Sequence, residues 1–474
     1  MGRTGVPAFV GPSAFFDLPR ESGRQTRRSA PQAAYNLYMD ILRRMREDWD
    51  RRAREDAFYY AGFGRRHQEQ REFLSSAGGV LQTIACELVR LPAAPVQSRR
   101  ALEIGCGPGR LMLPMSAHFG EIHGVDISEE MAARAREALQ GVPHAHAHVH
   151  VTPGDGLGMF ADESFDFIYS YIVFQHIPDP EIVLNYLREA RRTLKTGGVL
   201  CCQLRGAPPL PTEMQRHAPT WTGCFFTGGQ MALFAREHDF HLVAISGLNT
   251  QYMWTTWLKP APYGPADSSR TVLKAVTAAS GGAPRVPARG PAAAVSLWID
   301  GLPQSCHLGN LEVAFHQDRA PACYLSPIAE SGACQLNARV PDGVRPGVAP
   351  VTLYYDGRAL GEPGNIEILA PAPRAPRVIS VSDGLDIESK NRVVMGGVKV
   401  TIEDIERPEE VLFSVDGRAV EFGQFECKDP VTSTYEFAFL LSPKTRLATR
   451  LLTVRVSGLD LPPVSIEIAG LCAF

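Results

Sequence analysis

Two hydrophobic patterns divide the chain near residue 260. From Pro31 to Ala57, apolar residues such as Tyr35, Ile41 and Met45 recur at helical spacing, while charged residues fill the other faces. This pattern predicts an amphipathic helix, which we expect to pack on the domain that follows. A second helix is predicted from Phe73 to Leu91, and strand and helix patterns alternate after it.

The alternating segment predicts a mainly parallel sheet with helices on both faces. The expected strands are Arg100 to Ile104, Ile122 to Val125, His148 to Thr152, Phe165 to Tyr169, Val199 to Leu204, Leu242 to Ile245 and Tyr252 to Trp257. The expected helices between them are Leu111 to Ala117, Glu129 to Leu139 and Glu181 to Leu194. Such alternation requires crossovers, so the expected fold class is α/β, a Rossmann-like doubly wound sheet of seven strands with N-terminal helices. The turn around Gly247 and Asn249 is too short for a crossover, which makes the last strand antiparallel.

Short strands separated by turns replace the helices after Lys259. Pro, Gly, Ala and Ser dominate up to Gly290, and turns such as Asp342-Gly343 and Asp416-Gly417 then punctuate the strands. This spacing is typical of all-β immunoglobulin-like sandwiches. The expected organisation is a flexible N-terminus (1–30), the α/β domain (31–264), one sandwich (265–372) and a second sandwich (373–474).

Charge and composition narrow the classes of partner. The 474 residues carry a net charge of -3, which provides no global field for nucleic acid or an anionic membrane surface. The segment from Met1 to Arg20 lacks the apolar core of a signal peptide, and no later stretch approaches the roughly 18 apolar residues of a membrane helix. We therefore expect a cytoplasmic protein that binds neither nucleic acid nor membrane, with its cysteines reduced.

The clearest chemical motif follows the first strand of the expected sheet. Leu102 to Arg110 is Leu-Glu-Ile-Gly-Cys-Gly-Pro-Gly-Arg, with three alternating glycines between a strand and a helix. Glycine lets the backbone approach a ligand closely, and the helix that follows offers unpaired N–H groups and the positive end of a dipole, which suit a carboxylate. Taken alone, the glycines are also consistent with a tight strand-to-helix turn.

Two carboxylates follow at the same expected edge of the sheet. Asp126 ends the second strand, where it can accept hydrogen bonds from a ribose diol. Asp155 follows the third strand, where it can accept from an adenine amino group while Gly156 permits close approach. Open α/β sheets bind ligands at the carboxyl ends of their strands, so the three segments together favour a nucleoside-binding site.

These residues resemble the class I S-adenosylmethionine-dependent methyltransferase superfamily, in its small-molecule branch called type 11, over about residues 30 to 260. The resemblance implies that S-adenosyl-L-methionine is the cofactor, with its methionine part on Glu103 to Gly109, its ribose on Asp126 and its adenine on Asp155. The final antiparallel strand is also typical of the family. The cofactor-binding residues carried over in this way are Glu103, Gly105, Cys106, Gly107, Gly109, Asp126, Ile127, Asp155, Gly156 and Ser170.

Nicotinamide binding is the competing interpretation of the glycine motif. Its fingerprint is Gly-x-Gly-x-x-Gly, whereas the third glycine here, Gly109, comes one position early. The sequence therefore favours the methyltransferase interpretation.

The loop after the fourth expected strand contains the candidate catalytic residues, Gln175 and His176. The resemblance places this loop beside the methyl donor. His176 has an ordinary pKa suited to taking a proton from a hydroxyl or amine acceptor. Methyl transfer from an activated sulfonium can also proceed by positioning and desolvation alone, so a structural role for His176 stays open. Asp179 and Pro180 suit the N-cap and first turn of the next helix.

Two outer segments are candidates for covering the cavity, although packing against the sheet explains each of them equally well. One lies before the sheet, and the other lies in the insertion after the fifth strand, where this family varies to fit its acceptor. Their residues are Trp49, Asp50, Arg52, Glu55, Tyr59 and Tyr60 in the first segment, and Trp221 to Gly229 in the second.

Histidines alternate at the start of the third expected strand. His144, His146, His148 and His150 would project from one face of a strand, where they could bind a metal. No Asp, Glu or Cys shares the alternation, so we expect neutral strand histidines and no metal site.

The C-terminal sandwiches contain no candidate catalytic cluster. Leu336 to Val344, followed by Val351 to Leu353, resembles the strand pairs of immunoglobulin-like domains of the IPT/TIG type, which implies a binding, spacing or dimerising role. The expected function is methyl transfer to an unidentified small or medium acceptor, with a protein or polymer partner open for the β-domains. The alternative is a cofactor-binding scaffold or sensor in which the β-domains carry the recognition and no methyl is transferred.

Overall fold

The structure is a computed structural model that describes most of the chain. The described residues are 29–62, 67–140, 146–208, 219–290, 292–329, 331–370, 375–383, 390–393, 396–422, 424–429, 432–442 and 444–470. Residues 1–28 of the expected flexible N-terminus, and His144, lie outside these ranges. Within them, no helix combines the length and apolarity needed to span a membrane, and the nine described cysteines are free thiols.

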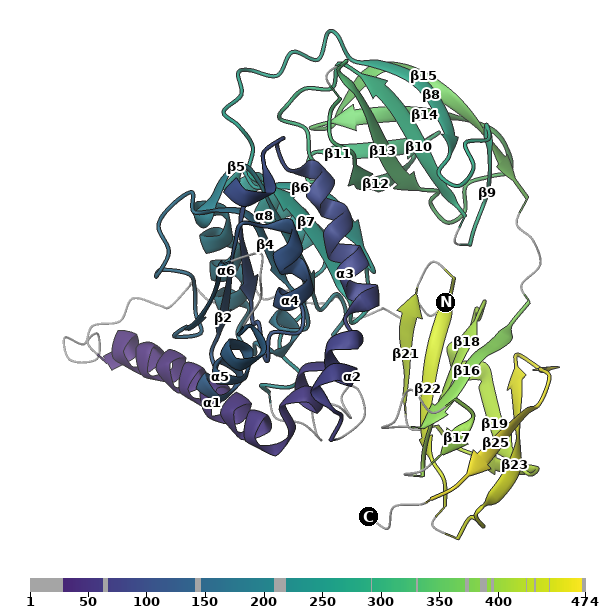
Figure 1. Cartoon of the computed structure of the whole chain (residues 1–474). Coiled ribbons are helices and arrows are strands. Elements are labelled where there is room, and N and C mark those ends of the chain that lie inside the picture. The colour runs from purple at the N-terminus through teal and green to yellow at the C-terminus, as the bar shows by residue number, and fades with distance from the viewer. Residues whose placement is uncertain are drawn as a thin grey trace, which may run out of the picture.

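Seven strands of the α/β part form a sheet in the order β3-β2-β1-β4-β5-β7-β6 (Figure 1). β7 runs antiparallel to β5 and β6, while the remaining neighbours pair in parallel. The expected antiparallel last strand is therefore confirmed. The bounds are β1 Arg100–Ile104, β2 Glu121–Asp126, β3 His146–Val151, β4 Phe165–Ser170, β5 Leu194–Leu204, β6 His241–Ser246 and β7 Met253–Leu258.

Helices cover both faces of this sheet (Figure 1). Side chains of α3, α4 and α5 share one apolar core with one face, and side chains of α1, α6 and α8 share another core with the opposite face. The helices are α1 Ser29–Gly62, α2 Gln70–Ser75, α3 Gly78–Ala85, α4 Met112–Met115, α5 Glu129–Ala138, α6 Pro180–Thr193 and α8 Gly228–His238, with short 3-10 turns η1 Cys86–Arg90, η2 Val96–Ser98, η3 Ser116–His118 and η4 Phe174–His176.

Local capping explains where the main helices begin. Asp179 accepts from the backbone N–H of Glu181 at 2.9 Å and Pro180 stands at the first helical position, as expected for the start of α6. Ser128 caps α5 by accepting from the Met131 backbone N–H at 3.2 Å. Both helices therefore start directly behind loops that follow strands β4 and β2.

The expected helix from Phe73 to Leu91 is broken in the structure. The hydroxyls of Ser75 and Ser76 donate to helix carbonyls three residues earlier, and Gly78 follows at once. Short hydroxyl side chains compete for backbone groups and glycine is a poor helix former, so the segment splits into α2, α3 and η1. The long first helix is also kinked, because Asp56 leaves helical geometry and its side chain accepts from the Tyr59 backbone N–H.

The first β-region joins the α/β sheet directly. Its strands form two arms, β8-β10-β13-β12 and β12-β11-β14-β15-β9, and β12 also pairs with β6 through Tyr324 and Ala244. β8 lies in the segment in which Pro, Gly, Ala and Ser dominate. This strand is not predicted from the sequence, because a short strand in such a segment resembles a linker in composition. The bounds are β8 Val272–Ala278, β9 Arg285–Pro287, β10 Ala294–Asp300, β11 Leu311–Phe315, β12 Asp318–Leu325, β13 Ala333–Arg339, β14 Gly347–Tyr355 and β15 Arg358–Leu369.

The second β-region has its own apolar core between two sheets. These sheets are β16-β18-β22-β21 and β17-β25-β23-β19-β20, with β24 paired to β23. The bounds are β16 Arg377–Asp383, β17 Arg392–Val393, β18 Gly397–Glu403, β19 Val411–Val415, β20 Arg418–Val420, β21 Gln424–Asp429, β22 Thr434–Leu440, β23 Ala448–Val456, β24 Leu459–Asp460 and β25 Val464–Ile468, with one 3-10 turn η5 Pro408–Glu410.

Candidate active site

A cavity lies at the carboxyl ends of β1, β2 and β4, the edge at which open α/β sheets bind ligands. Side chains and backbone from α1 and the loops after these strands enclose it. The cofactor-binding and catalytic candidates named from sequence that line it are Glu103, Gly105, Cys106, Gly107, Asp126, Ile127 and His176.

The glycine loop takes a backbone shape that other residues would strain. Gly105, Gly107 and Gly109 all have positive φ, and the Val125 carbonyl accepts from the backbone N–H of Gly105 at 2.8 Å. A Cβ on Gly105 would lie 2.2 Å from Val173. Gly109 does not line the cavity, and it instead lets the loop pack on the backbone of Ala135 in α5.

Asp126 connects the glycine loop to the start of α5. One carboxylate oxygen accepts from the Gly107 backbone N–H at 2.9 Å, and the other accepts from the Ser128 backbone N–H at 2.9 Å. Burial raises the pKa of Asp126 to about 6, against the opposing effect of these backbone donors. The side chain thus holds the loop and faces the cavity as well.

A buried carboxyl group and a buried guanidinium line the cavity beside this loop. Glu103 is 3% exposed and accepts from the Tyr169 hydroxyl at 3.0 Å, and burial raises its pKa to about 8. Arg110 donates to the Ser76 hydroxyl at 3.2 Å and lies over the rings of Phe73 and Tyr171. Burial lowers the pKa of Arg110 from its ordinary value. Sequence reasoning assigned no role to Arg110, although it directly follows the last glycine of the motif.

This pair of groups fits an amino-acid zwitterion. A buried acid suits an ammonium group, and a buried guanidinium suits a carboxylate. Asp126 and the backbone of Gly107 line the same cavity and offer further hydrogen-bonding groups. The donor set therefore fits a ligand with an amino-acid end and a hydroxylated sugar.

His176 borders the cavity as a neutral ring. Its Nδ1 lies 2.6 Å from the Trp221 carbonyl oxygen, which can only accept, so Nδ1 carries the proton. Its Nε2 then accepts from the Gln175 amide at 3.3 Å, and that amide oxygen accepts from Gln203. Burial lowers the pKa of His176 to about 3. Gln175 is buried and does not line the cavity.

Besides Gly109, three of the expected cofactor-binding residues lie outside the cavity lining. Asp155 accepts from the Tyr38 hydroxyl of α1 at 3.0 Å, and Ser170 donates to the Ile104 carbonyl at 3.0 Å. Gly156 packs against Asn185, while Gly154 lines the cavity in its place. Recognition of adenine by Asp155 stays a prediction.

The first helix covers the mouth of the cavity. Met45, Trp49, Tyr60 and Ala61 of α1 line it. Trp49 contacts the His176 ring with centroids 5.4 Å apart.

Arg52 joins this helix to the insertion after β5. Its guanidinium lies 4.8 Å from the centroid of Trp49 and 5.1 Å from that of Trp221, and it donates to Thr220. Trp221 also packs on His176 at 5.0 Å. The two outer segments named from sequence therefore meet over the site.

Comparison with known proteins finds a similar family for part of this segment. Residues 102–202 match the model of the methyltransferase domain family. Over these residues the chain is similar to methyltransferase domains. S-adenosylmethionine is the cofactor that this match supports.

Curated relatives match the same part of the chain. An uncharacterized methyltransferase of Schizosaccharomyces pombe is 32% identical over 111 residues, which are 22% of this chain and 39% of that protein. A demethylmenaquinone methyltransferase of Staphylococcus aureus is 31% identical over 125 residues, which are 25% of this chain and 48% of that protein. The matched segment thus spans less than half of the length of either relative.

Solved structures of methyltransferases are also similar in part. A SAM-dependent methyltransferase from Methanosarcina mazei is 20% identical with a TM-score of 0.29. The match covers 36% of this chain and 100% of that protein. A phosphoethanolamine N-methyltransferase of Haemonchus contortus, bound to phosphomonomethylethanolamine and S-adenosylhomocysteine, is 18% identical with a TM-score of 0.32 and covers 38% of this chain and 53% of its own.

Proposed function

We propose that this protein is an enzyme that transfers a methyl group from S-adenosylmethionine to a small or medium acceptor. The observation that carries the proposal is the convergence of Glu103, Arg110, Asp126 and the bare backbone at Gly107 on one cavity. Each of these groups matches a different part of a nucleoside that bears an amino acid.

The residues of the chain would bind and orient, while the cofactor supplies a methyl group already activated by a sulfonium charge. Glu103 would hold the ammonium and Arg110 the carboxylate of the methionine part. Asp126 would accept from the ribose hydroxyls. Trp49 and Tyr60 would exclude water from the cavity.

His176 is a positioning residue in this proposal. A ring whose pKa lies near 3, and whose Nε2 already accepts a hydrogen bond, is a weak base at neutral pH. Its contacts to Trp49 and the Trp221 carbonyl instead fix the aromatic wall of the cavity. Gln175 would support His176 from behind.

The β-regions are proposed as two immunoglobulin-like domains of the IPT/TIG type that bind or space a protein or polymer partner. Two sheets around a separate apolar core support this for residues 373–474. For residues 265–372, the support is a pair of sheets that share β12. A cytoplasmic location belongs to the same proposal.

The test is a mass-shift screen with the full chain, labelled S-adenosylmethionine and fractionated cell extract. The expected result is one product that carries a single added methyl group, together with an equal amount of S-adenosylhomocysteine. Asp126→Asn serves as the site-damaged control and should yield less of both at a cofactor concentration near the Kd of the parent chain. Tight cofactor binding without any methylated product would favour the sensor, and no cofactor binding at all would overturn the proposal.

A further inference from the structure

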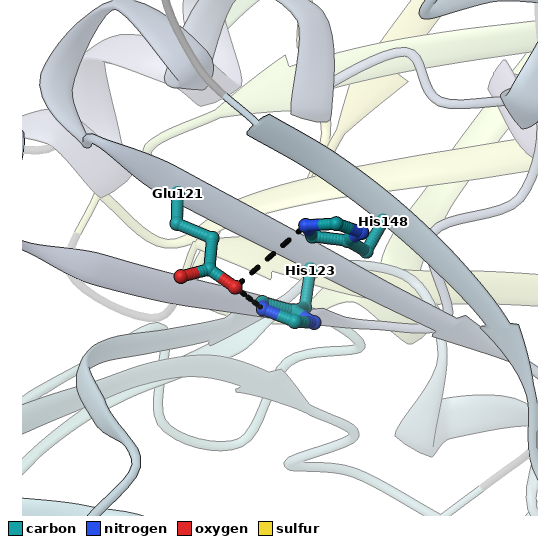
Figure 2. A group of neighbouring side chains, drawn as sticks. All are labelled: Glu121, His123 and His148. Atoms are coloured by element: carbon teal, nitrogen blue, oxygen red, sulfur yellow. Dashed lines mark hydrogen bonds and ion pairs between the residues drawn. The ribbon is translucent and has the colours of Figure 1, made fainter.

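A second polar cluster lies on β2 and β3, on the strand segments that lead up to the cofactor cavity. Glu121 and His123 project from β2, and His148 projects from the edge strand β3 (Figure 2). The parallel register places His123 directly beside His148. β2 therefore supplies the acidic residue that the histidine alternation of β3 lacks in sequence.

The donor atoms of the three side chains are close enough to share one ion. One carboxylate oxygen and two ring nitrogens all lie within 4.8 Å of one another. Glu121 Oε1 is 2.7 Å from His123 Nε2 and 3.7 Å from His148 Nε2. Tetrahedral Zn²⁺ holds nitrogen and oxygen ligands at about 2.0 to 2.2 Å, which puts neighbouring ligands roughly 3.3 to 3.6 Å apart. The observed spacings lie on either side of that range.

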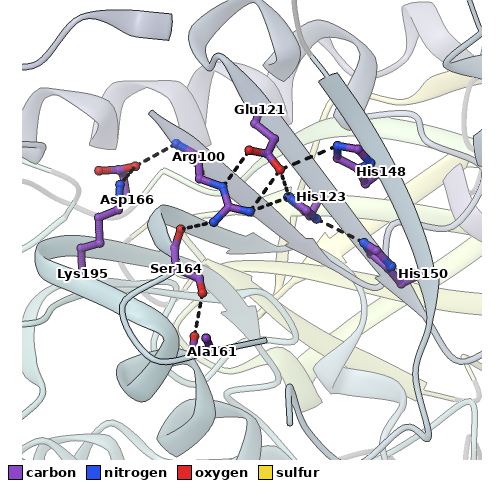
Figure 3. Close-up of polar contacts among 9 residues, drawn as sticks. All are labelled: Arg100, Glu121, His123, His148, His150, Ala161, Ser164, Asp166 and Lys195. Carbon is purple, nitrogen blue, oxygen red and sulfur yellow. Dashed lines mark hydrogen bonds and ion pairs between the residues drawn. The ribbon is translucent and has the colours of Figure 1, made fainter. Parts of the chain in front are cut away.

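Neighbouring side chains orient the donors. His123 Nδ1 lies 3.2 Å from His150 Nε2, so the far side of the ring is already hydrogen-bonded (Figure 3). Arg100 Nε donates to Glu121 Oε2 at 2.9 Å, which leaves Oε1 on the side of the histidines. Metal-binding histidines and carboxylates are commonly held by such outer hydrogen bonds.

Arg100 also competes for the position. Its Nη2 lies 3.1 Å from Glu121 Oε1 and 3.2 Å from His123 Nε2, so an ion needs that end of the guanidinium to swing away. The Arg100 side chain is 35% exposed, which gives it room to move. His148 is 47% exposed and leaves an open side for entry and for a water ligand.

We propose that Glu121, His123 and His148 form a binding site for one divalent transition-metal ion of the Zn²⁺ type, separate from the cofactor cavity. The ion would connect edge strand β3 to β2 and so stabilise that edge of the sheet. The site is independent of methyl transfer, because none of its three ligands lines the cavity.

The test uses the full chain after treatment with a chelator. Titration with Zn²⁺, and with Co²⁺ as a coloured substitute, should show one bound equivalent, a cobalt absorption band typical of nitrogen and oxygen ligands, and a higher unfolding temperature with Zn²⁺. His148→Ala should weaken binding at least tenfold, while the exposed His118→Ala, in the same domain, should bind as the parent does. Arg100→Gln should tighten binding by removing the competing cation.

Two outcomes would overturn the proposal. One is the absence of a stoichiometric metal signal in the parent chain. The other is unchanged metal affinity in both His148→Ala and Glu121→Gln, with circular dichroism and cofactor binding showing that both variants are folded. In either case the cluster is an ion pair with stacked histidines and no more.

Discussion

Asp126 has a structural role and a predicted ligand-binding role, and a single substitution separates the two roles only in part. It holds the Gly107 and Ser128 backbone groups and also faces the cavity. Replacement by alanine would remove both functions, whereas asparagine keeps the shape and one acceptor oxygen.

Asp126→Asn should weaken cofactor binding by about 1.5 to 3 kcal/mol, the value typical of a hydrogen bond to a charged group, or roughly 10- to 100-fold in Kd. Isothermal titration calorimetry measures it directly. Asp162→Asn is the matched control, since Asp162 is 74% exposed and pairs only with Arg192 among the contacts described. Equal affinities for Asp126→Asn and the parent would remove Asp126 from the site.

Glu103 gives cofactor binding a pH dependence with a definite sign. Its pKa of about 8 leaves the carboxyl protonated at pH 7, because burial disfavours the charge. A bound ammonium group favours the ionised form, so binding should release a proton, and affinity should rise from pH 6 until it levels off near pH 8.

Isothermal titration calorimetry in buffers of different ionisation enthalpy measures the number of protons released when the cofactor binds. Glu103→Gln should abolish the release near pH 7.5, while Asp126→Asn should keep it, because the pKa of Asp126 lies lower, at about 6. Undiminished proton release in Glu103→Gln would assign the titration to another group.

At the scale of elements, the glycine loop fits between β1 and the loop after β4. A Cβ added to Gly105 would collide with the Val173 side chain, whereas the nearest atom to a Cβ added to Gly107 would be Ala61 Cβ at 3.6 Å. The two glycines therefore serve different purposes, packing for the first and ligand approach for the second.

Gly105→Ala and Gly107→Ala should separate these purposes. Both substitutions should destabilise the folded state by roughly 1 to 2 kcal/mol, because a side chain is placed at positive φ. Only Gly105→Ala adds a collision with protein atoms. Gly105→Ala should thus lower the unfolding temperature clearly more, while Gly107→Ala should stay folded and lose cofactor affinity. Thermal unfolding and cofactor titration on both variants test this, and Gly105→Ala with Val173→Ala should recover part of the stability.

At the scale of the whole molecule, the α/β part and the first β-region share one core. Buried apolar side chains continue without a break from Leu242 and Ile245 of β6 to Leu308 and Leu325. The Leu308 backbone N–H donates to the Leu242 carbonyl at 2.8 Å, and Arg90 donates to the Leu325 carbonyl at 2.7 Å. The second β-region has a separate core.

This division predicts how the chain tolerates shortening. A chain that ends at residue 370 should keep cofactor binding and lose one calorimetric transition. A chain that ends at residue 264 exposes the edge of β6 and its apolar contacts, and should aggregate or melt roughly 5 °C lower or more. Differential scanning calorimetry on the full chain and on both shortened chains tests this prediction. A stable, monomeric chain of 264 residues would show that the interface contributes little.

Local patterns in the amino-acid sequence were enough to predict the strand and helix alternation and the position of the glycine loop. They also placed Glu103 and Asp126 at the carboxyl edge of the sheet. These features depend on local periods of two and 3.6 residues and on backbone conformations that glycine permits, and such information is carried by neighbouring residues.

Which distant groups come into contact depends on the folded chain. In the fold, Arg110 lines the cavity and Asp155 accepts a hydrogen bond from Tyr38. His176 is neutral beside the Trp221 carbonyl, and Glu121 lies next to His148. Burial and strand register cause these outcomes, and both depend on residues far apart in the chain. The pairing of β12 with β6 has the same origin, because an open strand edge carries no local signal of the strand that will cover it.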